Sequence, residues 1–254
     1  MPRQIITAAK PRQIVIVQAR MASTRLPGKI LQPLGGTTAL GQVLRRCAAI
    51  PGIDGVCCAI PDTPGHEPIA AEARRHGASV HAGPEDDVLA RYHGAAVRER
   101  ADMVLRVTSD CPLIDPQVCG AVLALRRDAG ADFAANNTPP SWPHGLDCEA
   151  MTMEALDRAA AAAARPGPER EHVTPWIRTA PGLTRVDLAG PGGALVGERW
   201  TLDYPEDLDF LRALFAVLPR EDAGWREIVA TLDAHPEIRA INAARRDPAR
   251  IPKA

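Results

Sequence analysis

Residues 17–29 read VQARMASTRLPGK and continue the apolar run at 14–17, which is typical of a buried strand. The segment carries three cations, Arg20, Arg25 and Lys29, and no acid. A loop that leads from a strand into a helix presents unpaired backbone N–H groups, and such groups bind phosphate. The segment therefore predicts a binding site for a triphosphate or pyrophosphate, with a solvated surface loop as the alternative.

Known phosphate-binding motifs do not match this loop. A Walker A loop requires GxxxxGK[ST], but Lys29 is followed by Ile30 and position 23 is a serine. A dinucleotide fingerprint requires GxGxxG after the first strand, where residues 19–24 contain no glycine. The HxGH signature of another nucleotidyl-transfer fold is also absent from the chain.

Apolar, strand-like runs alternate with helical patterns in the first half of the chain. Strands are expected at 14–18, 55–60, 79–81 and 103–107, and helices at 39–50, 67–76 and 86–100. This alternation predicts an α/β fold with a doubly wound, mostly parallel sheet and helices on both faces. Ligands of such sheets bind beyond the carboxyl ends of the strands, where the opening loop and residues 108–112 fall.

The pattern changes after residue 130. Strands are expected at 132–135, 145–151 and 199–202, and helices in the alanine-rich stretch after 151, at 169–179 and at 206–217. We expect residues 12–244 to form a single domain in which about 135–198 is an insertion that covers the site or makes a dimer contact. Residues 1–11 and 245–254 are expected to be flexible tails.

Composition excludes several classes of protein. A chain of 254 residues with 46% hydrophobic residues suits one large α/β domain. The net charge of −1 argues against general binding to nucleic acid or to anionic membranes. No stretch approaches the roughly 20 apolar residues that span a bilayer, and residues 1–11 lack the apolar region of a secretory signal, so a cytoplasmic protein is expected. The six cysteines form no CxxC pair or zinc-spaced cluster, which favours buried thiols.

The loop VQARMASTRLPGK resembles the signature loop of the cytidylyltransferases that activate acidic sugars, a family that includes the 3-deoxy-manno-octulosonate and acylneuraminate enzymes. Further segments that resemble the family follow in the same order, namely DVLARY (87–92), RVTSDCPLID (106–115), PHGLDCE (143–149), REHVT (170–174) and LDYPEDL (202–208). Together they span about residues 14–210. Within the family, the chain resembles the branch associated with spore-coat polysaccharide synthesis.

The resemblance implies transfer of CMP from CTP to an acceptor oxygen with release of pyrophosphate. In such chemistry the protein mainly positions the reactants and neutralises charge. The matching positions imply that Arg25 and Lys29 bind the triphosphate and that Asp110 and Asp203 hold Mg²⁺, an ion that prefers carboxylate, phosphate and water oxygens. These four residues are the predicted catalytic set. Taken singly, Asp110 and Asp203 are also typical of helix N-caps and Asx turns.

The resemblance implies further contacts to the nucleotide. The predicted nucleotide-binding residues, besides Arg25 and Lys29, are Ala19, Arg20, Ser23, Asp87, Arg91 and Thr108. Asp87 and Arg91 fall on the segment that resembles the family's base pocket. An acid that only stabilises the N-terminus of the following helix is the alternative for Asp87.

Four other residues, Asp147, Glu149, Arg170 and His172, resemble positions that line the acceptor pocket. His172 could orient an acceptor carboxylate or phosphate, or take its proton near neutral pH, with a helix-surface histidine as the alternative. Because Asp147 and Glu149 would repel an anion, we expect an acceptor that presents an amine or hydroxyl groups.

The expected partners are CTP and a small-molecule acceptor, without nucleic acid or membrane. The resemblance also implies a homodimer formed through the 135–198 segment, where Trp142 and Trp176 would suit an apolar interface. One alternative is use of another nucleoside triphosphate to make an NDP-sugar, although those enzymes carry a Gly-rich loop whose glycines fall where this loop has Ala19, Met21 and Ala22. The other is a scaffold without catalysis, which would have no need for Lys29, Asp110 and Asp203.

Overall fold

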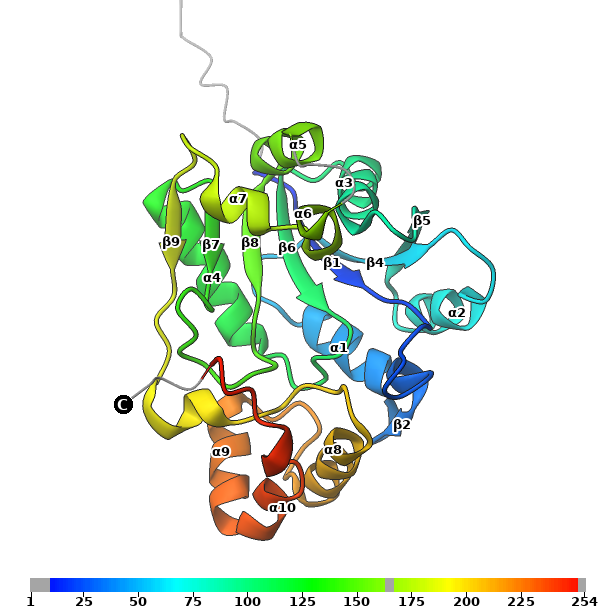
Figure 1. Cartoon of the computed structure of the whole chain (residues 1–254), viewed down its shortest axis with the longest axis vertical. Helices are drawn as coiled ribbons and strands as arrows, with labels where there is room; N and C mark the ends of the chain where they lie inside the picture. Colours follow the sequence, from blue (N-terminus) through cyan, green and yellow to red (C-terminus); the bar gives the residue numbers. More distant parts are fainter. Residues whose placement is uncertain (1–9, 163–166, 251–254) are drawn as a thin grey trace, which may run out of the picture.

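A seven-stranded sheet lies at the centre of the computed structural model, which describes residues 10–162 and 167–250 (Figure 1). Its strands are β1 (Gln13–Gln18), β4 (Gly55–Pro61), β5 (Ser79–Gly83), β6 (Met103–Thr108), β7 (Phe133–Ala135), β8 (Glu149–Thr152) and β9 (Arg185–Asp187). Their order is β5-β4-β1-β6-β8-β7-β9. β2 (Pro33–Leu34) and β3 (Thr37–Thr38) form a small antiparallel pair outside this sheet.

The sheet is mostly parallel, as predicted. β1 pairs in parallel with both β4 and β6, and β4 pairs in parallel with β5. β8 runs antiparallel to β6 and β7, and β9 is again parallel to β7. The carboxyl ends of β1 and β6 are neighbours because Gln18 pairs with Thr108, so the loops that follow these strands start side by side.

Helices cover both faces of the sheet. The helices are α1 (Ala39–Ala48), α2 (Glu67–Arg75), α3 (Val88–Arg98), α4 (Pro116–Ala129), α5 (Met153–Ala162), α6 (Pro168–His172), α7 (Pro175–Thr179), α8 (Pro205–Val217), α9 (Trp225–Ala234) and α10 (Pro236–Ala240), with short 3₁₀ turns η1 (Lys29–Leu31), η2 (Gly193–Gly197) and η3 (Ala243–Arg245). Side chains alternate between the faces of a strand. Val15 and Val17 therefore pack with α1, α2 and α4, while Ile14 and Ile16 pack with α3, α5 and α7.

A third apolar cluster lies beyond the end of the sheet. In it, α8, α9 and α10 pack around Trp200 and Trp142, which are 0% and 8% exposed. The Trp142 ring meets the Trp225 ring edge-on at 5.4 Å, and its Nε1 donates a hydrogen bond to the backbone of Leu188. Trp142 is therefore a core residue, and the expectation that it lies in an exposed apolar interface is wrong.

The segment 135–198, expected as an insertion that covers the site or makes a dimer contact, is part of the central sheet. It supplies β8 and β9, and β8 pairs directly with the central strand β6. Its buried residues Ala150 and Met151 belong one to each core, which requires a position within the sheet. Among its described residues, those that line the site belong to the short helix α6.

Two element predictions also differ from the structure. The helix expected at 169–179 is split into α6 and α7, because Val173 has a φ of 70° and Pro175 begins the second helix. The strand expected at 199–202 forms only a single bridge, between His144 and Arg199. It runs extended between two loops and has no ladder partner.

The described part of the C-terminal tail is held in place, contrary to expectation. Arg250 makes a two-pronged ion pair with Asp147, with both N···O distances at 2.9 Å, and contacts the backbone of Trp142. Long-range ion pairs of this kind cannot be read from the local composition of residues 245–250. The expected tail at 1–11 falls mostly on residues 1–9, which lie outside the described residues, as do 251–254.

Candidate active site

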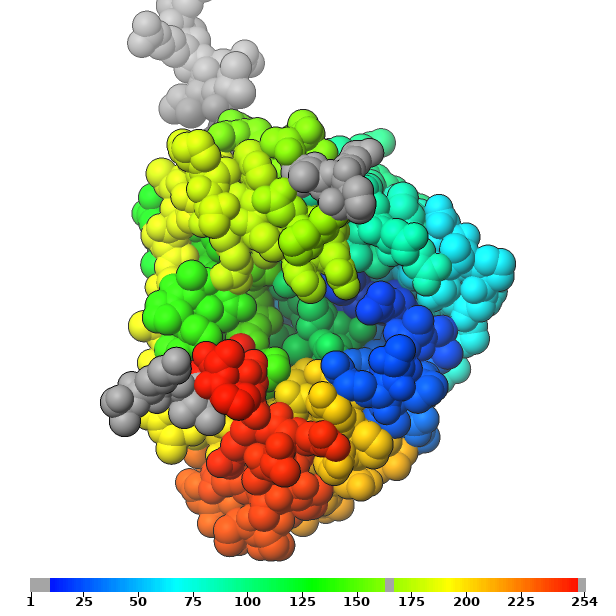
Figure 2. Space-filling model, viewed as in Figure 1, coloured from blue at the N-terminus to red at the C-terminus, as the bar shows by residue number. Residues whose placement is uncertain are grey.

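A cleft of about 250 Å³ opens at the carboxyl ends of β1 and β6. On the face seen in Figure 2, a hollow lies between the blue N-terminal loop, the yellow-green region of α6 and the red C-terminal residues. The cleft collects ten of the predicted site residues, namely Ala19, Arg20, Ser23, Arg25, Lys29, Arg91, Thr108, Asp110, His172 and Asp203. Residues far apart in the sequence therefore meet in one place.

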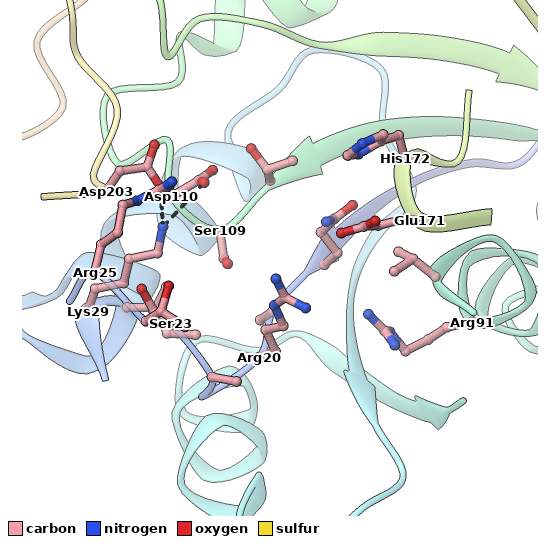
Figure 3. A pocket seen from close by; sticks show the side chains of 17 residues that line it. Arg20, Ser23, Arg25, Lys29, Arg91, Ser109, Asp110, Glu171, His172 and Asp203 are labelled. Atoms are coloured by element: carbon pink, nitrogen blue, oxygen red, sulfur yellow. Dashed lines mark hydrogen bonds and ion pairs between the residues drawn. The ribbon is translucent and has the colours of Figure 1, made fainter. Parts of the chain in front are cut away.

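The loop after β1 reaches the cleft through a tight turn. Gly28 adopts a φ of 67°, a left-handed conformation that side chains disfavour. The turn is closed by a hydrogen bond from Lys29 N to Leu26 O at 3.2 Å, and Ser23 Oγ accepts one from Leu26 N. This geometry places Lys29 at the start of η1, with its side chain directed into the cleft (Figure 3).

Lys29 lies between the two carboxylates that were predicted to hold metal (Figure 3). Its ammonium is 2.8 Å from Asp203 Oδ1 and 3.4 Å from Asp110 Oδ2, and it donates to the backbone carbonyl of Leu202 at 2.7 Å. The Lys29 ammonium thus bridges the loop after β6, which carries Asp110, and the turn before α8, which carries Asp203. The loop needs no acid of its own because the acids come from elsewhere in the chain.

Asp203 is the most heavily paired of these groups. Arg25 contacts its Oδ1 at 2.7 Å, and Arg199 contacts its Oδ2 at 3.2 Å. Burial alone would raise the pKa of the Asp203 carboxyl, but the hydrogen bonds and charges of Lys29 and Arg25 lower that pKa to about 2. The same hydrogen bond raises the pKa of the Arg25 guanidinium. Asp203 is therefore ionised at neutral pH.

Backbone contacts hold Asp110 beside Asp203. Leu202 N and Thr201 Oγ1 both donate to the Asp110 carbonyl, at 2.8 and 3.0 Å. The thiol of Cys111 contacts Asp110 Oδ1 at 3.6 Å, on the opposite side of the carboxylate from Lys29. The loop after β6 and the segment before α8 are thus tied together, which explains how two distant aspartates converge.

The donor set fits a magnesium ion that shares its coordination with a nucleotide. Among the described residues, no three His, Cys, Asp or Glu side chains form a group that could enclose a metal. Asp110 and Asp203 nevertheless converge on a single cation, the Lys29 ammonium. Mg²⁺ usually takes one or two carboxylates and completes its shell with water and phosphate oxygens. Two converging carboxylates beside a cationic loop suit that arrangement.

The other end of the cleft carries a different set of side chains. Arg20, Arg91, Glu171 and His172 lie there, away from Lys29 (Figure 3). Arg91 is 2% exposed and donates to the backbone of the 84–85 turn, and burial lowers the pKa of its guanidinium. Glu171 was not predicted from the sequence, although it stands beside His172 in the REHVT motif. Both lie on the exposed rim formed by α6.

Two predicted residues bind each other instead of lining the cleft. Asp87 caps α3 by accepting a hydrogen bond from Ala90 N at 2.8 Å, and Arg170 Nε donates to Asp87 at 2.9 Å. Arg170 is 2% exposed. The pair joins α3 to α6, so the alternative of a helix N-terminal acid describes Asp87 correctly. The predicted direct roles of Asp87 in base binding and Arg170 in acceptor binding are not supported.

Glu149 and Asp147 also lie outside the cleft lining. Glu149 is 1% exposed, and its two oxygens are paired with Arg106 at 2.6 Å and Arg178 at 2.5 Å. Burial would raise the pKa of the Glu149 carboxyl, but these two charges lower it below its usual range. With Asp147 paired to Arg250, both acids are neutralised. The expectation that they contact the acceptor and repel an anionic one is therefore wrong for Glu149 and loses its reason for Asp147.

Arg199 and Asp207 are site residues that the sequence analysis missed. Both are buried, at 6% and 0% exposure, and they pair at 2.8 Å directly behind Asp203. Asp207 belongs to the LDYPEDL segment, where it was not singled out. Arg199, Asp203 and Asp207 follow one another at intervals of four residues, which is a weak signal in the sequence. Only the structure shows that the three side chains meet.

Comparison with known proteins gives a consistent result. A model of the cytidylyltransferase family matches residues 14–214. The spore coat polysaccharide biosynthesis protein SpsF of Bacillus subtilis (strain 168) is 29% identical over 231 residues, which cover 88% of this chain and 95% of that protein. The 3-deoxy-manno-octulosonate cytidylyltransferase of Xanthobacter autotrophicus is 30% identical over 244 residues, covering 89% and 88% of the two chains.

A solved structure of a cytidylyltransferase from Leptospira borgpetersenii is 27% identical and superimposes with a TM-score of 0.84. The match covers 90% of this chain and 97% of that one. None of the helices in residues 10–162 and 167–250 has the length and apolar character needed to cross a membrane.

Proposed function

Since the chain belongs to the cytidylyltransferase family, we propose that it transfers the CMP group of CTP to a small acceptor and releases pyrophosphate. The acceptor is a sugar, an acidic sugar, or a metabolite that bears a phosphate or phosphonate. One observation carries the proposal: Lys29 bridges Asp110 and Asp203 in the same cleft that Arg20 and Arg25 line. A triphosphate and a divalent ion need this combination of charges.

In the proposed reaction, an acceptor oxygen forms a bond to the α-phosphorus of CTP as the bond from that phosphorus to the bridging oxygen of pyrophosphate breaks. Arg25 and Lys29 would stabilise the negative charge that gathers on the departing pyrophosphate. Both side chains are anchored on Asp203, so their positive charges are already oriented before substrate binds. When substrate and metal bind, these two side chains would need only to exchange Asp203 for nearby phosphate oxygens.

Asp110 and Asp203 are the residues that would hold Mg²⁺. The ion would supply further neutralisation of the phosphate oxygens. When it is bound, the Lys29 ammonium would no longer be needed to balance both carboxylates and could turn to the phosphates. Removal of divalent ions with EDTA should therefore abolish turnover, and added Mg²⁺ should restore it. Asp110→Asn should lose turnover and keep much of its nucleotide binding.

The remaining cleft residues suit the nucleoside and the acceptor. Ala19, Arg20, Arg91 and Thr108 are proposed to contact the nucleotide, and His172 the acceptor. The exposed position of His172 at the rim leaves its ring accessible. With Asp147 and Glu149 neutralised, an anionic acceptor is compatible with the site.

Homodimerisation and a cytoplasmic location stay predictions. In the described residues, the exposed large apolar side chains are Val97, Val217 and Ile241. All six cysteines are buried and unpaired, as a reducing compartment allows. Light scattering at working concentration tests the oligomer, and a monomer would contradict the expectation.

The proposed function is tested by measuring pyrophosphate release from CTP, UTP, ATP and GTP with Mg²⁺. Each nucleotide is paired with carboxylate, phosphate, phosphonate and hydroxyl acceptors. We expect release that depends on CTP and on one acceptor class. Release from a purine triphosphate alone would contradict the cytidylyl assignment, and no release with any pair would favour a non-catalytic protein.

A further inference from the structure

The turn that carries Asp203 is held by the buried carboxylate of Asp207. Asp207 Oδ2 accepts hydrogen bonds from the backbone N–H groups of Asp203 at 2.9 Å and Tyr204 at 3.0 Å. Arg199 donates to the same carboxylate through Nε and Nη2, each at 2.8 Å. Because Arg199 Nη2 also contacts Asp203 Oδ2 at 3.2 Å, Asp207 and Arg199 together orient the backbone and the side chain of Asp203.

Asn242 completes this cluster from the C-terminal part of the chain. Its Nδ2 donates to Asp207 Oδ1 at 3.0 Å and to the backbone carbonyl of Arg199 at 2.9 Å. Both of these oxygens only accept hydrogen bonds, so the amide nitrogen of Asn242 has to face them. The side chain is 3% exposed, and no water is needed to satisfy the contacts.

The neighbours of Asn242 fasten the same region. Arg245 lies over the Tyr204 ring at 4.3 Å, on the ring that Arg25 approaches at 4.8 Å, and it pairs with Glu206 at 3.0 Å. The red C-terminal residues lie beside the hollow in Figure 2. The family match ends at residue 214, so this support comes from a part of the chain outside the matched region.

We propose that Asn242 is a positioning residue for the transfer reaction, which fixes Asp207 and Arg199 and thereby directs the Asp203 carboxylate toward Lys29 and Arg25. Without the Asn242 amide, the buried Arg199 carbonyl loses its donor, and Asp207 Oδ1 keeps only the hydrogen bond from Arg199 Nε. A buried acceptor left unsatisfied is costly, so the cluster rearranges to recover a hydrogen bond. A shift of Asp203 by a fraction of an ångström is enough to slow a reaction that depends on alignment.

The proposal rests on the proposed function, and its test combines turnover with a measurement that needs no substrate. Asn242→Leu is close in size and removes both donated hydrogen bonds. We expect kcat to fall by about tenfold or more while KM for CTP changes by less than about threefold, because the loop at 17–29 is untouched. In nucleotide-free protein, the amides of Asp203 and Tyr204 should exchange with deuterium about tenfold faster or more, and those of β1 at the wild-type rate.

Leu232→Ala is the matched control. Leu232 is 0% exposed on α9, in the apolar cluster that also contains Trp200, and makes no hydrogen bond with Asp207 or Arg199 through its side chain. It should lower the melting temperature and leave kcat and the exchange of the 203–204 amides unchanged. A fall in kcat that is equal in the two variants would mean that lost stability explains the effect, and would overturn the proposal.

Wild-type kcat together with wild-type exchange in Asn242→Leu would also overturn it. If wild-type protein releases no pyrophosphate from any nucleotide, the proposed function fails instead. The exchange measurement still decides, in that case, whether Asn242 orders the Asp203 turn.

Discussion

Lys29 donates a hydrogen bond to Asp203 at 2.8 Å, although 174 residues separate them in the sequence. The pair joins the loop after β1 to the turn before α8, and Asp110 completes it from the end of β6. A positive group thus stands where two carboxylates converge. A triphosphate with its divalent ion can replace these contacts, since its phosphate oxygens can pair with Lys29 and its metal ion with the two carboxylates.

Lys29→Met is expected to lower kcat by about 10² to 10³, the usual effect of removing one preorganised charge-stabilising donor. The variant should fold, because Lys29 is a cleft residue and its methylene groups are kept. Steady-state pyrophosphate release measures the effect. Lys10→Met is the control, since Lys10 is exposed and pairs with Asp54 away from the cleft. Wild-type turnover in Lys29→Met would remove the loop from the mechanism.

Asp203→Asn should change how stability depends on pH. The folded-state pKa of about 2 lies below the unfolded value of about 3.9. Ionised Asp203 therefore stabilises the fold above about pH 4, and this contribution is lost as the pH falls toward 2. At neutral pH, the free energy of unfolding of the wild type should exceed that of the variant by about 2 kcal/mol.

Denaturant unfolding at several pH values tests this, with exposed Asp209→Asn on α8 as the control. The difference between wild type and Asp203→Asn should shrink between about pH 4 and pH 2. A difference that stays constant over that interval would contradict the ion-pair origin of the shift.

Glu149→Ala should act on stability and not on acceptor binding. It leaves Arg106 and Arg178 without their shared carboxylate, and breaking a buried pair typically costs about 3–5 kcal/mol. Thermal unfolding measures this, with exposed Glu154→Ala on α5 as the control. An unchanged melting temperature with a raised acceptor KM would restore the role in acceptor binding.

His172→Ala should raise KM for the acceptor by about tenfold, the effect of losing one hydrogen bond to a charged group. KM for CTP should stay within about threefold of wild type, since the triphosphate contacts lie at the other end of the cleft. Kinetics with each substrate varied in turn provide the measurement. His235→Ala, a partly exposed position that pairs with Glu237, is the comparison. Equal kinetics for the two variants would make His172 a surface residue.

Local signals in the sequence were sufficient to predict the strands β1, β4, β5 and β6 and to place the candidate site at the carboxyl ends of the sheet. Hydrophobic periodicity decides whether a short segment is a strand or a helix, and right-handed crossovers decide how such strands assemble. The cations of the loop were also recognisable, because they stand directly after a strand pattern. Asp110 and Asp203 were predicted as metal ligands because they match the family's positions.

The sequence could not show how charged residues pair over long distances. Glu149 and Asp147 look like site acids in the PHGLDCE motif, yet each is neutralised by arginines from other elements. The position of β8 beside β6 and the burial of Trp142 depend in the same way on contacts made only in the folded chain.

What the sequence by itself determined was the class of fold, the cationic loop after the first strand and the carboxylates proposed to hold a metal, since these follow from local patterns and residue chemistry. Only the tertiary structure decided which acids face the cleft and which are paired with arginines outside it. The reason is electrostatic: the charges that surround a carboxylate come from partners distant in the sequence, 103 residues away for Arg250 and Asp147 and 174 for Lys29 and Asp203.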